Sequence, residues 1–196
     1  MVQSETGIKA DNVLNMLNER DALKVLYYFA NSEHHFDKYT EFMTEILNIF
    51  REIRDEQSEG SNEREILGKF INKLENIISS LPNPYMVLDS VIENNQFSVN
   101  KPGIRTGNPQ CGMIQNLVDE KRREIIQSLI KEAENEYNEY INNLMEIVKV
   151  LEKLGKEKGS NEVNKFIEKL KTAISNIPSP FDVLVSAYNE TVGSKF

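Results

Sequence analysis

The chain has 196 residues, and its 23 Lys and Arg against 31 Asp and Glu give a net charge of −8. Because nucleic-acid binding releases counterions at clustered Lys and Arg, this balance excludes a generally basic nucleic-acid coat protein. The length allows one large domain or two small ones, and the single cysteine, Cys111, excludes an internal disulfide and a cysteine-rich zinc site.

No stretch of the sequence has the length of a membrane span. The longest apolar run, Val25–Ala30, is far shorter than the roughly 20 residues that cross a bilayer. The first residues, Met1–Asn12, are polar and lack the apolar core of a signal peptide. We therefore expect a soluble, cytoplasmic protein with no membrane partner.

The first part of the chain contains several helical patterns. Residues 11–17 and 22–30 read as helices, and Asn31 with Ser32 offers a break and a new N-cap before Glu33. Apolar side chains at helical spacing then continue through residues 36–53. These patterns predict separate helices on the two sides of Asn31-Ser32.

Capping signals delimit the next two helices. In Gly60-Ser61-Asn62-Glu63, either Asn62 or Ser61 can cap a helix that runs to Leu81, and Glu65 suits reciprocal capping with Asn62. The motif Pro82-Asn83-Pro84 then ends that helix. Asn83 is the natural N-cap of a short last helix, and Pro84 is its first residue, where a missing N–H is tolerated.

The same features recur later in the chain. Residues 15–20 match residues 116–121, and the turn of residues 60–63 recurs at 159–162. Order, spacing and chemistry are kept, which predicts a tandem duplication. The apolar residues Phe36, Tyr39, Met43, Ile46, Leu47, Phe50 and Ile53 match Tyr137, Tyr140, Leu144, Ile147, Val148, Leu151 and Leu154, and Pro82, Pro84, Val87, Leu88 and Ser90 match Pro178, Pro180, Val183, Leu184 and Ser186.

The second copy lacks an internal stop signal. Residues 113–154 contain neither Gly nor Pro, so one long helix, straight or kinked, is expected there. No segment alternates apolar and polar residues long enough to predict a sheet. We therefore predict an all-α fold, a tandem duplication of a three- to four-helix antiparallel unit in an elongated, pseudo-twofold helical bundle, with repeats at 1–96 and 113–196 joined by a linker at 97–112.

The segment between the copies is the best candidate for ligand or partner contact. Residues 94–118 contain no acidic residue but include Lys101 and Arg105. Gly103 and Gly107 would let backbone N–H groups converge on an anion beside Arg105. A solvated connector, or a strap across the interface between the copies, explains the same composition, and we favour that interpretation. The densest basic cluster, Lys121, Arg122 and Arg123, is enclosed by acids and is expected on a solvated helix face.

The sequence does not predict an enzyme. His34 and His35 are adjacent, and neighbours point to different sides of a helix, whereas metal ligands need a spacing of three or four residues. Cys111 lies in no known nucleophile motif. No phosphate-binding loop, dinucleotide-binding turn or zinc motif is present. We therefore expect no catalytic residue, no metal and no cofactor.

Residues 21–30, Asp-Ala-Leu-Lys-Val-Leu-Tyr-Tyr-Phe-Ala, resemble the opening helix of winged-helix transcription regulators. The resemblance consists of apolar spacing, and the recognition helix and wing of such a fold are not visible downstream. It implies a nucleic-acid-associated subunit or regulator, which would use Lys101, Arg105 and Lys121–Arg123.

A non-enzymatic scaffold or adaptor is the favoured prediction. Its partner would be another protein bound at helical grooves, and a second copy of the chain is a further candidate. Before Val99 there are 9 Lys and Arg against 17 Asp and Glu, and from Val99 onward the counts are 14 and 14. This division predicts that the first copy presents an acidic face to a basic partner.

Overall fold

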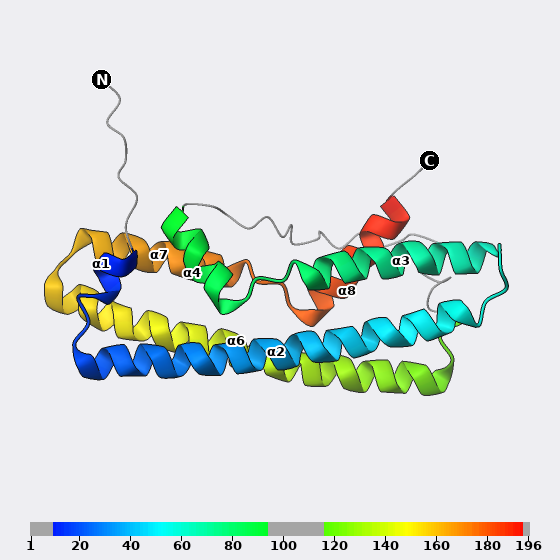
Figure 1. The fold of residues 1–196 in the computed structure, drawn as a ribbon, viewed down its shortest axis with the longest axis horizontal. Coiled ribbons are helices and arrows are strands. Elements are labelled where there is room, and N and C mark those ends of the chain that lie inside the picture. Colours follow the sequence, from blue (N-terminus) through cyan, green and yellow to red (C-terminus); the bar gives the residue numbers. More distant parts are fainter. Residues whose placement is uncertain (1–9, 94–115, 194–196) are drawn as a thin grey trace, which may run out of the picture. The chain divides into compact units, whose positions relative to one another are not determined.

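The computed structural model describes residues 10–93 and 116–193, and in these two stretches it is all-helical without strands (Figure 1). The all-α class predicted from the sequence is therefore confirmed. The helices are α1 (Ala10–Leu14), α2 (Glu19–Asp55), α3 (Asn62–Ser79), α4 (Pro84–Glu93), α6 (Glu120–Lys158), α7 (Asn161–Ser175) and α8 (Pro180–Gly193).

The break predicted at Asn31-Ser32 is wrong, because α2 runs through it without interruption. Ser32 is fully buried, and its hydroxyl donates to the carbonyl oxygen of Phe29 at 2.7 Å. A serine can bond in this way to the preceding turn of its own helix, so its side chain is satisfied without capping a new one. Ser32 is therefore part of the buried side of α2.

The two long helices begin at side-chain caps. The amide oxygen of Asn18 accepts from the backbone N–H of Asp21 at 2.9 Å, and a carboxylate oxygen of Asp119 accepts from the N–H of Arg122 at 2.9 Å. Each cap satisfies an N–H that has no partner within the first helical turn. The long helix expected within residues 113–154 is continuous from Glu120, but it does not include Val118 and Asp119, and it runs through Gly155 to Lys158.

At both turns after the long helices, serine is the capping residue. The hydroxyl of Ser61 accepts from the N–H of Arg64 at 3.2 Å, and that of Ser160 accepts from Val163 at 3.3 Å. The preceding Gly60 has a φ of 75° and Gly159 a φ of 58°, values that strain residues with a Cβ. Of the two caps that the sequence left open, Ser61 is thus the one used.

The proline motifs behave as predicted. α4 begins at Pro84 and α8 at Pro180. The side chain of Asn83 accepts from the N–H of Met86 at 2.9 Å, and that of Ser179 accepts from Asp182 at 3.2 Å. Because proline has no N–H to satisfy, it fits the first position of each helix.

The described residues form two compact units. Unit 1 comprises residues 10–36, 82–93 and 138–177, and unit 2 comprises residues 37–81, 116–137 and 178–193. Each unit contains one half of α2 and one half of α6. In unit 1, α4 packs with α7, and in unit 2, α3 packs with α8.

Both units draw on the two predicted repeats. The last helix of the first repeat packs with a helix of the second, and the last helix of the second packs with a helix of the first. Each compact unit thus combines segments of both predicted repeats. The predicted linker, 97–112, lies outside the described residues, so the boundaries at 1–96 and 113–196 stay a prediction.

The core of each unit follows the apolar stripes. The largest fully buried side chains are Tyr39, Met43, Ile46, Ile53, Leu67, Ile71 and Leu74 in unit 2, and Tyr140, Leu144, Ile147, Leu151 and Phe166 in unit 1. Their spacing of three or four residues along α2, α3, α6 and α7 places them on one side of each helix.

Two buried tyrosines connect the long helices to the proline motifs. In unit 2, the hydroxyl of Tyr39 donates to the carbonyl oxygen of Pro178 at 3.1 Å. In unit 1, the hydroxyl of Tyr140 donates to the carbonyl oxygen of Pro82 at 2.8 Å. Both tyrosines are fully buried. Each bond thus joins a long helix of one predicted repeat to the proline turn of the other.

We expect Tyr39→Phe and Tyr140→Phe each to lower the free energy of unfolding by about 1–2 kcal/mol, because each leaves a buried carbonyl oxygen without its donor. Urea unfolding of the purified chain measures this change. Tyr27→Phe, at a side chain that is 63% exposed, is the matched control and should change little. Equal stability of all three variants and the unsubstituted chain would contradict this role of the hydroxyls.

Each compact unit is made of segments from both halves of the chain. Because each unit needs segments from both halves of the chain, fragments 1–98 and 99–196 should copurify when they are produced together with a tag on one of them. Each fragment produced alone should lack a cooperative unfolding transition. Two monomeric fragments that each unfold cooperatively would instead support independent repeats.

Candidate interaction surface

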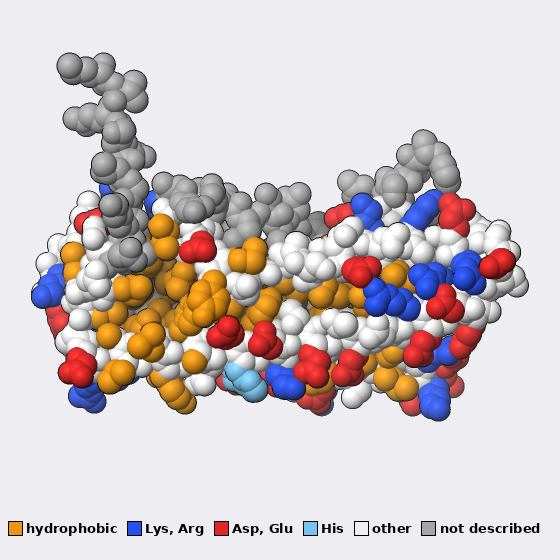
Figure 2. Space-filling model, in the orientation of Figure 1, with side chains coloured by type: hydrophobic (Ala, Val, Ile, Leu, Met, Phe, Trp, Pro, Cys, Tyr) orange, Lys and Arg blue, Asp and Glu red, His pale blue; other side chains and the backbone are white. Residues whose placement is uncertain are grey.

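Large apolar side chains are exposed on one part of unit 1. Leu23, Leu26 and Tyr27 of α2 are 61%, 64% and 63% exposed, and Tyr85 and Met86 of α4 are 54% and 42% exposed. These five residues are called the unit 1 apolar surface below. Figure 2 shows hydrophobic side chains gathered over α2 and α4. Exposed apolar patches of this kind mark interaction sites in many proteins.

The surface exists because the first half of α2 is apolar on more than one side. Val25 and Ser32 are buried and define the side that faces the core. With about 100° of rotation per residue, Leu23 and Tyr27 lie opposite that side, and Leu26 lies at its edge. A helix that is apolar around most of its circumference is usually covered by other structure on all sides.

Aromatic packing connects the two helices that carry the surface. The rings of Phe29 on α2 and Tyr85 on α4 meet edge to face, with centroids 4.7 Å apart. On α4, Val87 and Val91 are buried, whereas Tyr85 and Met86 remain exposed. The exposed Tyr85 of α4 therefore lies next to α2.

Charged residues flank the α2 part of this surface, with one sign on each side. Glu19 and Glu33 lie on the same edge of the helix as Leu26, and Arg20 and Lys24 lie on the opposite edge. All four charged side chains belong to exposed residues. The apolar strip of α2 thus has an acidic flank and a basic flank.

A buried carboxylate holds the beginning of α2 against α6. Asp21 is only 5% exposed, and its Oδ2 accepts from Lys153 Nζ at 3.0 Å and from the Asn18 amide at 2.9 Å. The bond from Lys153, followed by the bond from Asn18, lowers the pKa of Asp21 below its ordinary value of 3.8. The charged form of Asp21 is thus the one that the fold favours.

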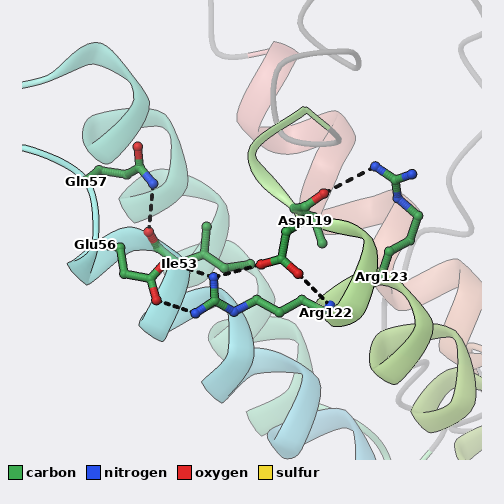
Figure 3. Close-up of polar contacts among 7 residues, drawn as sticks. Ile53, Glu56, Gln57, Asp119, Arg122 and Arg123 are labelled. Carbon is green, nitrogen blue, oxygen red and sulfur yellow. Dashed lines mark hydrogen bonds and ion pairs between the residues drawn. The ribbon is translucent and has the colours of Figure 1, made fainter.

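The predicted basic cluster is engaged in contacts within unit 2 (Figure 3). Arg122 pairs with both carboxylate oxygens of Glu56, one of them at 2.8 Å, and with Asp119 at 3.0 Å. The hydrogen bond from Arg122 lowers the pKa of Glu56. A guanidinium held by two carboxylates joins α2 to the start of α6.

The other four residues predicted to contact an anion or a partner are Lys121, Arg123, Lys101 and Arg105. Arg123 donates to the carbonyl oxygen of Val118 at 3.2 Å, and Lys121 is exposed. Lys101 and Arg105 lie outside the described residues. Their role as anion or partner contacts stays a prediction.

Neither the two histidines nor a surface hollow of the described residues forms a site for chemistry. His34 and His35 are in edge-to-face contact, with centroids 5.3 Å apart. Within residues 10–93 and 116–193, no three His, Cys, Asp or Glu side chains are arranged to hold a metal ion, and Cys111 is not among these residues. A hollow beside α6 and α7 is lined by charges that pair with each other, with Lys171 Nζ at 2.8 Å from Glu152 and 3.2 Å from Glu168.

Sequence reasoning missed the unit 1 apolar surface. The apolar run Val25–Ala30 is too short to span a membrane, and its length alone does not indicate an exposed surface. The signal that could have found the surface is that Leu23, Leu26 and Tyr27 lie off the stripe that contains Val25 and Phe29. Apolar residues on both sides of one helix predict a second covering partner.

Comparison of the chain with protein-family models, curated proteins and solved structures found no match. Among the helices of the described residues, none combines the length and the apolar character needed to cross a bilayer.

We expect the stabilisation that Asp21 provides to depend on pH. Because the pKa of Asp21 is lowered in the folded chain, this stabilisation is fully present above pH 3.8 and is lost as the pH falls through the lowered pKa. Asp21→Asn should therefore melt below the unsubstituted chain at pH 7, and the difference should narrow below about pH 4. Thermal unfolding at several pH values measures it, with the exposed Asp89→Asn as control. A difference that is constant with pH would contradict this assignment.

Proposed function

We propose that the chain is a non-enzymatic helical interaction protein, a scaffold or adaptor, and that it binds another protein chain through the unit 1 apolar surface. The observation that carries the proposal is the exposure of Leu23, Leu26 and Tyr27 on one side of α2, in the same unit as the exposed Tyr85 and Met86 of α4. Exposed apolar groups at spacings of three and four residues are the anchors that helix-binding partners use.

The energetics of burial support this proposal. Covering a large apolar side chain completely contributes roughly 1.5–3 kcal/mol. Three side chains that are each more than half exposed therefore offer a sizeable driving force, of which association itself consumes a part. Tyrosine, present on both helices of the surface, is also enriched among the residues that dominate binding energy.

We further propose that the chain arose by tandem duplication of a three-helix unit, α2 to α4 and α6 to α8. In support, Tyr39 and Tyr140 occupy matching positions and each bonds to the proline turn of the other copy. The turns at Ser61 and Ser160 use the same cap. Such agreement in detail is expected when one unit has been copied.

The alternative function, association with nucleic acid, has less support. Phosphate binding by the basic cluster would require a guanidinium directed to solvent. Arg122 is instead held by Glu56 and Asp119, and Arg123 is bonded to Val118. Salt-dependent binding to DNA or RNA that weakens in Lys121→Ala would restore this alternative.

Site-specific crosslinking tests the interaction proposal. A photoreactive phenylalanine derivative is placed at Tyr27 or Tyr85, and in a third variant at Phe181, an aromatic side chain of α8 that is 60% exposed. After irradiation in the cells that produce the chain, we expect protein adducts from positions 27 and 85. The Phe181 variant is the matched control and should give little adduct.

The positions at which adducts form decide between a specific interface and nonspecific contact. Adducts at 27 and 85 that disappear when Leu23→Glu is added would support a specific interface, because a buried charge opposes binding. Equal adduct formation at Phe181 would indicate nonspecific contact. No adduct from either position of the unit 1 apolar surface would sink the proposal.

A further inference from the structure

Resting on the proposed function, we infer that the partner on α2 is a second copy of this chain, with the two α2 helices side by side and parallel. The first reason is the spacing of the exposed residues. Leu23, Tyr27, Ala30 and His34 follow one another at intervals of four, three and four residues, and all are exposed. This interval is the seam of a two-stranded coiled coil.

The second reason is the arrangement of charge. Glu19 and Glu33 border the seam on one side, and Lys24 borders it on the other, whereas Arg20, three residues before Leu23, lies at the start of the seam itself. When two copies pair in parallel, a twofold axis along the helices brings the acidic flank of each copy against the basic flank of the other. In an antiparallel pair, flanks of the same charge would meet. Charge complementarity therefore selects the parallel arrangement.

One interchain ion pair can be named from this register. Glu19 precedes the seam residue Leu23 and Lys24 follows it, so Glu19 of one copy approaches Lys24 of the other. Lys24 is available because its contact to Asp21 is long, at 3.8 Å. Asp21 keeps its closer bond from Lys153 at 3.0 Å when Lys24 turns toward the partner.

The sequence of α2 also sets the end of the contact. Beyond His34, the next two seam positions are Asp37 and Glu41, and Glu45 flanks the seam after them. In a parallel pair each of the two seam acids would face the same acid of the second chain, and this repulsion between like charges is unfavourable. The two α2 helices are thus expected to separate after His34, and the contact is confined to the part of α2 that belongs to unit 1.

Sedimentation equilibrium of the full chain tests the inference. We expect a reversible dimer, and we expect Leu23→Glu to raise the dimer dissociation constant at least tenfold. Phe181→Glu introduces the same charge at an equally exposed apolar residue of unit 2 and should leave the dissociation constant unchanged. Because both substitutions are at exposed positions, we expect each variant to be folded, and circular dichroism checks this.

Charge exchange tests the direction of the helices. Glu19→Lys alone and Lys24→Glu alone should each weaken the dimer about fivefold, since each sets like charges against each other at two places. The double variant Glu19→Lys/Lys24→Glu should recover the original affinity. Mixing the two single variants should yield a heterodimer that is tighter than either homodimer.

Several results would overturn the inference. A chain that stays monomeric at all concentrations, or a dimer that is indifferent to Leu23→Glu, excludes this contact. Tighter dimerisation of Glu19→Lys excludes the parallel arrangement, because it indicates that acidic flanks meet. If the crosslink at Tyr27 joins a different protein while the chain is monomeric, the proposed function stands and only the identity of the partner is wrong.

Discussion

The fold depends on one constraint, the antiparallel packing of α2 against α6. Pairs of residues trace it within each unit. In unit 1 Asp21 contacts Lys153 and Phe36 contacts Tyr140, and in unit 2 Tyr39 contacts Tyr137 and Arg122 contacts Glu56. Because neither long helix has a complete core without the other, the shorter helices pack on a platform to which both halves of the chain contribute. The tyrosine hydroxyls then fix the two proline turns to this platform.

The uneven charge of the two proposed repeats has a structural use in this arrangement. Asp21 near the start of α2 and Glu56 directly after its end are acids, and Lys153 and Arg122 near the two ends of α6 are bases. Glu52 matches Lys153 between the copies, so a second α2 in the place of α6 would set an acid against Asp21. Opposite charges at the ends thus favour pairing of unlike helices. An acidic face directed at a basic partner stays a prediction, since internal pairing accounts for part of the same imbalance.

Short sequence patterns predicted the features of this fold that depend on residues close together in the sequence. The caps at Ser61 and Asn83 and the long helix after Asp119 were readable because they depend on neighbours in sequence. The break at Ser32 failed because burial let its hydroxyl bond to the preceding turn, which composition does not reveal. The packing of α3 with α8 and of α4 with α7 could not be predicted, because the matching apolar stripes of the two halves of the chain fit either partner equally well. The unit 1 apolar surface was missed for a related reason, since apolar residues off the stripe look like additional core.

The packing of helices from the two halves of the chain also constrains how the protein folds during its synthesis. Unit 1 extends in sequence to residue 177, and unit 2 needs residues 178–193. During synthesis, the apolar stripes of α2 and α3 therefore emerge from the ribosome well before α6 and α8, the helices that cover them. Neither unit can close until nearly the whole polypeptide has been translated. A nascent chain of this design exposes its stripes for longer than one whose domains are contiguous, and it depends more on chaperones that shield apolar segments during synthesis.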